Sequence, residues 1–403
     1  MNKQRIFALC MALPLLLGGC AVRRDRGGED ETEKQLRVLP ETETTEAKTP
    51  FSGFSDEEMQ RFLETSKMPS PAAVTALPQS STQYDKALAK QALSFCAGYT
   101  AAQQAQLFEA LGFTVLKQEN YDKESTDASH TSAYTLAKGT ASVGGRESRL
   151  LVLSVRGTNG GEWFSNIDVA PSQNEETKFA ENFFLAAQQI FAATLELVRT
   201  QDCPVLVCGH SRGGACADLL AYFFSEAIGA ERVYGYTFAA PMTVRGAQEE
   251  FAAENIFNCI STADLAPYVP LGAWGYRRIG TDVILQADAA LTVATKERVA
   301  IFERLAPTLA SYYTVRHSLS GSGEAEDGVT TFSLLYAALC ARLLQSDAQN
   351  TVGFDTSLIS QTSDFAPLIN LFEELTAQGG AGLSELAKQH MPASYDALID
   401  LQN

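Results

Sequence analysis

The chain has 403 residues, of which 45% are hydrophobic and 20% charged, and its formal net charge is −17. An apolar fraction of this size, with 29 Gly and 14 Pro, excludes a mainly disordered or collagen-like protein. The acidic balance argues against nucleic-acid binding, which needs a basic surface, so we expect no nucleic-acid partner. Eight cysteines without a Cys-x-x-Cys motif argue against a disulfide scaffold and a zinc ribbon. We expect no metal and no cofactor.

The first twenty residues have the pattern of a secretion signal. Two basic residues precede an apolar run over residues 6–17. As a helix this run would span about 18 Å, well short of the roughly 30 Å of bilayer hydrocarbon. It ends in Leu-Gly-Gly-Cys at residues 17–20, which resembles a bacterial lipobox and implies lipidation of Cys20 after removal of residues 1–19. The alternative is an ordinary secretory signal with an unmodified Cys20.

The composition along the chain, together with the signal pattern, predicts four segments. We expect a signal peptide over residues 1–19, a flexible tether over 20–50, a folded domain over 51–345 and a helical extension over 346–403. A lipid on Cys20 would anchor the protein to a membrane of the bacterial cell envelope, facing outside the cytoplasm. We expect a monomer.

Predicted helices and strands alternate along the domain, in chain order. Helices are expected over residues 55–67 and 84–111, strands over 113–117, 132–137 and 149–155, a helix over 176–199, a strand over 204–208, a helix over 213–227, strands over 232–239 and 255–262, and helices over 292–309 and 330–344. This alternation implies an α/β fold with a mostly parallel central sheet flanked by helices. The tail from residue 347 shows only short helices near 365–377 and 383–390, as a packed appendage or a small helical addition.

The strand at 204–208 runs directly into Gly-His-Ser-Arg-Gly-Gly at residues 209–214. Gly-x-Ser-x-Gly between a strand and a helix is the nucleophile elbow of serine hydrolases, which makes Ser211 the predicted nucleophile. The elbow places the serine at a strained tip, and side chains at Gly209 and Gly213 would collide there. His210 leaves the turn in another direction, so we assign it to packing.

A serine nucleophile needs a histidine base, and in α/β-hydrolases the base follows both the serine and the acid. Two histidines follow the serine, His317 and His390. His317 comes after a predicted helix and before a loop rich in Gly and acidic residues, and we assign it as the base. His390 ends an amphipathic tail helix, where exposure to solvent is the alternative account.

The acid that orients the base is assigned to Asp264. It follows the strand at 255–262, and active-site groups of open α/β sheets gather at the carboxyl ends of the strands. Asp282 in a turn and Asp288 after another strand are the rivals.

Four ordered motifs between residues 87 and 343 resemble the class 3 lipase family, the fungal-type α/β-hydrolases. They are Arg-Gly-Thr at 156–158 with Trp163, Asn166 and Asp168; the elbow at 209–213; Tyr-Thr-Phe-Ala-Ala-Pro at 236–241; and Asp-Leu-Ala-Pro at 264–267. The resemblance implies an α/β-hydrolase fold and a lid between residue 158 and about residue 170.

The resemblance also implies roles for individual residues. Thr158 would be the oxyanion residue, with the N–H of Arg212 as the second donor. Trp163, Phe164 and Ile167 would face the substrate or cover the serine as part of the lid.

The chain departs from the family at two places. Ala239 stands where the family has Gly, and Gly-Tyr-Arg-Arg at 275–278 lacks the His often found there. His317 then remains as base, 53 residues after Asp264 (317 − 264).

Together these features predict a carboxylic ester hydrolase, a lipase or esterase that works through an acyl-enzyme. The resemblance makes lipids the expected substrates. Because a Gly-Gly pair and Glu162 make the predicted lid less apolar, an esterase acting on non-lipid esters such as acylated polysaccharide is an alternative. A catalytically silent surface-binding protein on the same fold is another.

Overall fold

The computed structural model describes residues 76–96, 100–121, 131–157, 178–268, 270–319 and 388–402. The predicted signal peptide at 1–19, Cys20, the tether at 20–50 and the predicted helices at 55–67, 330–344 and 365–377 lie outside the described residues. The strands are β1 (Ala76–Leu77), β2 (Thr114–Glu119), β3 (Tyr134–Val143), β4 (Arg146–Val155), β5 (Val205–His210), β6 (Val233–Phe238), β7 (Val244–Arg245), β8 (Ile256–Ser261), β9 (Tyr276–Arg277) and β10 (Thr281–Leu285). The helices are α4 (Lys86–Ser94), α5 (Ala101–Ala110), α7 (Glu181–Gln201), α8 (Arg212–Ile228), α9 (Ala289–Leu319) and α15 (Pro392–Asp400).

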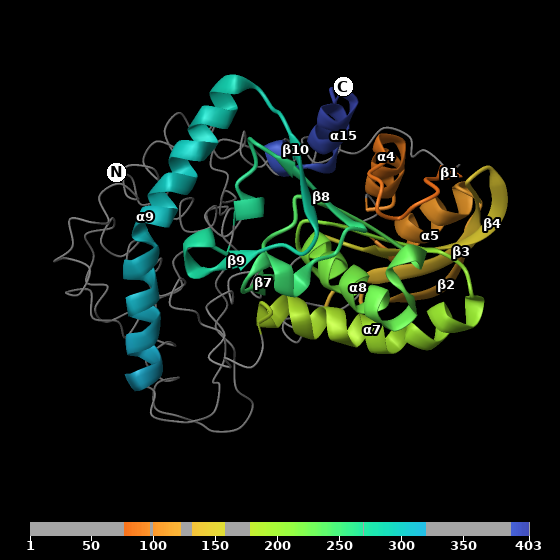
Figure 1. Ribbon diagram of the computed structural model, residues 1–403, viewed down its shortest axis with the longest axis horizontal. Helices are drawn as coiled ribbons and strands as arrows, with labels where there is room; N and C mark the ends of the chain where they lie inside the picture. The colour runs from red at the N-terminus through yellow and green to blue at the C-terminus, as the bar shows by residue number, and fades with distance from the viewer. Residues whose placement is uncertain are drawn as a thin grey trace, which may run out of the picture.

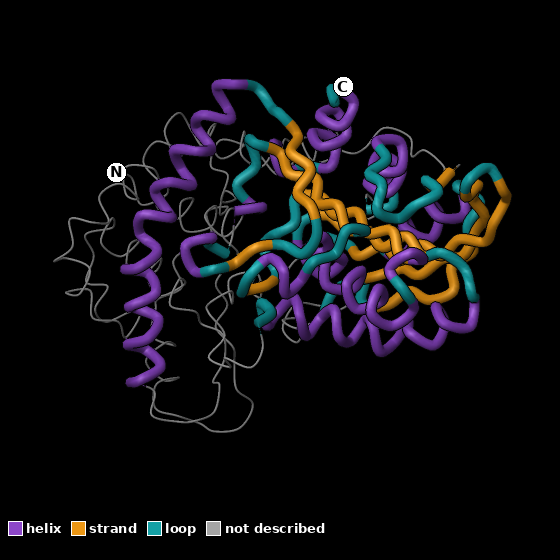
Figure 2. Tube along the Cα trace, viewed as in Figure 1, coloured by secondary structure: helices purple, strands orange, loops and turns teal. Residues whose placement is uncertain are grey.

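A central sheet of eight strands organises these elements. Its order is β1-β3-β4-β5-β6-β8-β10, and β2 pairs with β3 at one side. The strands β4, β5, β6, β8 and β10 run parallel, whereas β3 is antiparallel to both β2 and β4. Helices α7 and α8 cover one face, and α4 and α15 cover the other (Figures 1 and 2). The predicted fold class, α/β with a mostly parallel sheet flanked by helices, is confirmed.

Both faces of the sheet are buried, and β4 shows why. Leu151 and Leu153 join the hydrophobic cluster beneath α7 and α8, whereas Leu150 and Val152 join the cluster on the opposite face. Successive side chains of a strand point to opposite faces. A nearly continuous apolar run is therefore what a strand needs when helices cover both faces.

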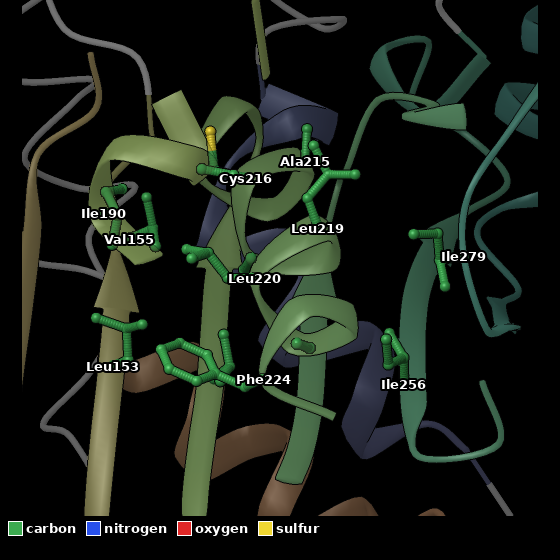
Figure 3. Packing of buried hydrophobic residues seen from close by; sticks show 14 of the residues in the cluster. Leu153, Val155, Ile190, Ala215, Cys216, Leu219, Leu220, Phe224, Ile256 and Ile279 are labelled. Carbon is green, nitrogen blue, oxygen red and sulfur yellow. The ribbon is translucent and has the colours of Figure 1, made fainter. Parts of the chain in front are cut away.

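Helix α8 packs directly on the strands that hold its own N-terminus. Figure 3 shows Leu220 and Phe224 of α8 beside Leu153 and Val155 of β4. All four side chains are fully buried. This packing fixes the direction in which the helix leaves the end of β5, and so the position of the turn between them.

The helix predicted over residues 84–111 is two helices. The second, α5, begins at a capping box in which the Thr100 hydroxyl accepts from the Gln103 N–H and the Gln103 side chain accepts from the Thr100 N–H. Such a cap satisfies N–H groups that a helix start leaves without acceptors, and it specifies a new helix.

The described tail segment, residues 388–402, packs on the domain. Tyr395 and Ile399 of α15 are fully buried in the cluster that includes α4. At the rim, the Lys90 ammonium lies 2.6 Å from the Asp400 carboxylate and 3.4 Å from Asp396. The predicted division at residue 345 therefore separates two segments that share one core. No helix within the described ranges is both long and apolar enough to cross a membrane.

Candidate active site

Ser211 occupies a sharp turn between the end of β5 and the start of α8. Its backbone angles are φ 58° and ψ −127°, a conformation that residues with a side chain rarely adopt. The Ser211 N–H donates to the Phe238 carbonyl of β6 at 2.9 Å, which ties the turn to the neighbouring strand. Strained backbone of this kind persists only where the surrounding structure holds it, and it gathers at functional sites.

The glycines on either side of Ser211 leave no room for a side chain. A Cβ on Gly209 would lie 2.0 Å from the Gly213 carbonyl oxygen. A Cβ on Gly213 would lie 2.3 Å from the carbonyl oxygen of Val155 in β4. These contacts are with backbone atoms that side-chain rotation cannot move, so both positions require glycine.

His390 links Ser211 to Asp264. Its Nε2 lies 2.8 Å from the Ser211 Oγ, and its Nδ1 lies 2.8 Å from Oδ2 of Asp264. An ionised carboxylate only accepts hydrogen bonds, so Nδ1 carries the proton and Nε2 accepts from the serine hydroxyl. The three side chains form the hydrogen-bonded order of nucleophile, base and orienting acid.

The prediction that His317 is the base was wrong. His317 lies on the long helix α9, and the position between Ser211 and Asp264 is taken by His390. His390 comes two residues before α15, and the docking of α15 on the core carries it to the turn. Residues 383–387 of the predicted tail helix at 383–390 lie outside the described residues, but α15, which follows His390, buries Tyr395 and Ile399 in the core.

Asp264 is held by contacts from three directions. It follows β8, and its side chain is 3% exposed. Its Oδ1 accepts from the Ala266 N–H at 3.0 Å, and its Oδ2 accepts from the Tyr395 hydroxyl at 2.8 Å as well as from His390. Burial and the adjacent carboxylate raise the pKa of Tyr395 well above its ordinary value, so its hydroxyl stays protonated and donates.

The two rival carboxylates have other partners. Asp282 binds Arg278 through two contacts of 2.9 and 2.7 Å. Asp288 accepts from the Ala290 N–H at the start of α9. Of the three aspartates, Asp264 at the end of β8 is the one that contacts His390.

Arg278 stands where the class 3 lipases named in the sequence analysis often have His. It holds the loop that carries Asp264 in place. Its Nη1 donates to the carbonyl of Ala240 at 3.1 Å and also to the carbonyl of Pro267. Ala240 follows β6, and Pro267 lies in the 3-10 turn after Asp264. The guanidinium therefore joins the segment beside the elbow to the segment that carries the acid.

Arg212, the predicted second oxyanion donor, is the first residue of α8. Its side chain turns away into the core, where Nε donates to the Ser132 hydroxyl at 3.2 Å and the guanidinium lies over the Phe183 ring. Its backbone N–H lies at the positive end of the helix dipole, directly after Ser211. Thr158 and the lid candidates Trp163, Phe164 and Ile167 lie outside the described residues.

His210 is buried beside the nucleophile, and its Nε2 lies 2.7 Å from the carbonyl oxygen of His390. It is neither the base nor a packing residue alone, and sequence reasoning missed this contact because nothing local to residue 210 points to the tail.

Within the part of the chain that the structure describes, no group of three or more His, Cys, Asp or Glu side chains could hold a metal ion.

A family model described as lipase (class 3) matches residues 152–273, which include the end of β4, the elbow and Asp264. Similar solved structures include a lipase propeptide complex from Rhizomucor miehei, with 16% identity, 67% of this chain and 84% of the other covered, and a TM-score of 0.36. A lipase from Rhizopus microsporus var. chinensis aligns with 17% identity over 55% of this chain and 80% of its own, with a TM-score of 0.35. No curated protein matches the sequence. Residues 152–273 are thus similar to the class 3 lipases, and the sheet, elbow and flanking helices around them form a fold of the α/β-hydrolase type.

Proposed function

We propose that the protein is a serine ester hydrolase in which Ser211, His390 and Asp264 carry the reaction. The supporting observation is the hydrogen-bonded order of these three groups, with both contacts of His390 at 2.8 Å. The lipase (class 3) match over the segment that holds two of them favours ester substrates.

In this mechanism the Ser211 hydroxyl attacks the acyl carbonyl while its proton passes to Nε2 of His390. The buried Asp264 carboxylate stabilises the imidazolium that forms. The N–H of Arg212 at the start of α8, together with Thr158, would stabilise the oxyanion. His390 then gives its proton to the leaving alcohol, and water, activated by the same ring, hydrolyses the acyl-enzyme. The His390 side chain is 17% exposed, which leaves it accessible to substrate and water.

Labelling with a fluorophosphonate tests the proposal, because this probe reacts with an activated serine. The wild type should be labelled and Ser211→Ala should not. His390→Ala should be labelled at least about 100-fold more slowly, the usual contribution of a general base. His317→Ala is the matched control and should react like the wild type. A folded wild type that resists the probe would refute the enzyme assignment, and loss of labelling in His317→Ala would refute His390 as the base.

Lipids are the substrates we propose, with Cys20 as a lipid anchor that keeps the enzyme beside a membrane. Hydrolysis rates for esters of short and long acyl chains, measured with and without a lipid interface, separate a lipase from an esterase on non-lipid substrates. If esters of long acyl chains are hydrolysed faster when an interface is present, the protein is a lipase. If the interface does not change the hydrolysis rates, the protein is an esterase. Detergent partitioning of the wild type against Cys20→Ala tests the anchor.

A further inference from the structure

His210 contacts the main chain of the base from the position next to the nucleophile. It is the last residue of β5, and its side chain is buried against the segment that carries His390. Its Nε2 lies 2.7 Å from the carbonyl oxygen of His390. Because a carbonyl oxygen only accepts hydrogen bonds, Nε2 must carry the proton, and it donates across a sequence separation of 180 residues.

The ring of His210 is wedged between two parts of the site. On one side its centroid lies 5.0 Å from the ring of His390 and 6.1 Å from the ring of Tyr395. On the other side its Nδ1 faces the end of β4, where a Cβ on Gly157 would lie 3.5 Å away. That distance is an ordinary van der Waals contact, so the ring packs between the end of β4 and the base.

His210 stays neutral over the range in which a serine hydrolase works. Burial, and to a smaller extent the neighbouring His390, lower its pKa to about 3. A neutral ring has one N–H and one acceptor nitrogen, so the donor on Nε2 is present at every pH above this value. A second positive charge also does not form beside the imidazolium that the reaction creates on His390.

We propose that His210 is a positioning residue for the catalytic base: its Nε2–H anchors the main chain at His390 to the strand that presents Ser211. The inference rests on the proposed function, because it concerns the same base. The nucleophile and the anchor are consecutive residues of one rigid turn. The anchor therefore keeps the distance between base and nucleophile constant even though the two belong to remote segments. A base that shifts by about 1 Å can lower the rate by about 100-fold.

Three substitutions separate the hydrogen bond from the packing. His210→Gln places an amide N–H near the position of Nε2, His210→Asn places it near Nδ1, and His210→Phe keeps a ring without a donor. We expect kcat for a soluble p-nitrophenyl ester to fall about 10- to 100-fold in His210→Phe and His210→Asn, with KM changed less than about twofold. His210→Gln should recover to within about fivefold of the wild type. The proposal would be overturned if the three variants had the same kcat as one another. It would also be overturned if kcat fell only in proportion to the loss of stability, measured as the midpoint of unfolding.

A spectroscopic measurement tests the anchor without relying on activity. In ¹⁵N spectra of the histidine-labelled wild type, His210 should keep one protonated and one unprotonated ring nitrogen from pH 5 to 8, with the proton on Nε2 and slow to exchange. A proton on Nδ1, or titration within this range, would refute the anchor. The outcomes also remain distinguishable from those of the proposed function. A wild type that resists the fluorophosphonate contradicts the hydrolase, whereas a labelled wild type with an insensitive His210→Phe contradicts only the anchor.

Discussion

Replacing Tyr395 by Phe removes one oxygen atom from the support of the catalytic acid. In the wild type this hydroxyl donates to Oδ2 of Asp264 at 2.8 Å and accepts from the Ser261 N–H at 3.3 Å. The ring is fully buried, so phenylalanine fits the same space without creating a cavity. The substitution therefore tests the two hydrogen bonds with the packing unchanged.

The cost follows from the charge and burial of the two partners. A hydrogen bond to a charged group contributes about 1.5–3 kcal/mol, and a buried N–H left without an acceptor costs about 1–3 kcal/mol. The Ser261 N–H can recover part of this through other contacts, so we expect the free energy of unfolding to fall by about 2–4 kcal/mol. Because Oδ2 then holds His390 alone, the carboxylate has more freedom to turn, and kcat should fall by about 10-fold.

Urea unfolding and ester hydrolysis give the two numbers, and Tyr234→Phe is the matched control. Tyr234 is also buried, but its hydroxyl donates to the Pro78 carbonyl at 3.0 Å, away from the acid. The control should lose about 1 kcal/mol of stability and keep its kcat. If Tyr395→Phe also keeps full kcat, the hydroxyl does not orient the acid. If its stability is unchanged as well, the hydrogen-bond geometry around Asp264 is wrong.

Two further predictions concern residues near the site. Ala239 has φ 53°, so Ala239→Gly should raise the free energy of unfolding by up to about 1 kcal/mol in urea titrations, and a loss of stability would contradict strain at this position. Asp218 of α8 is fully buried, and burial raises its pKa from 3.8 to about 7. Its protonated form is favoured in the folded state, so its contribution is complete below pH 3.8 and is lost as the pH rises through 7. Between pH 4 and 8 the unfolding free energy of the wild type should therefore fall by on the order of 4 kcal/mol more than that of Asp218→Asn, and parallel curves would refute the shift.

The places of Ser211 and Asp264 in the candidate site could be predicted from sequence because each has a local cause. Ser211 is marked by the glycines that its tight turn requires, and Asp264 is marked by the end of a buried strand. The fold was predictable for the same reason, because the pattern that marks each apolar strand or amphipathic helix lies within a short stretch of the sequence. Three strands that escaped this reasoning, β1, β7 and β9, are two residues long and carry almost no pattern. The helix α15, which begins at Pro392, was also missed.

The base could not be predicted in this way because nothing local is required of it. A histidine needs only to reach the serine and the acid, and any segment that docks at the sheet edge can bring it there. The usable signal lay after His390, in the buried side chains Tyr395 and Ile399. An amphipathic helix with an apolar face must pack on something, and a histidine at its start is then carried to the same surface.

The origin of His390 in the tail also bears on how the enzyme becomes active. Ser211 and His390 are separated by 179 residues, and closing a loop of that length costs about 5 kcal/mol of chain entropy. Docking of α15 on α4 must offset this cost before the base is in place. The proposed catalysis therefore depends on contacts between α4 and α15, such as that of Lys90 with Asp400, which join residues 310 positions apart in the chain. Mild denaturant should abolish ester hydrolysis at concentrations that leave the parallel sheet intact, as a separate and earlier transition than the loss of secondary structure.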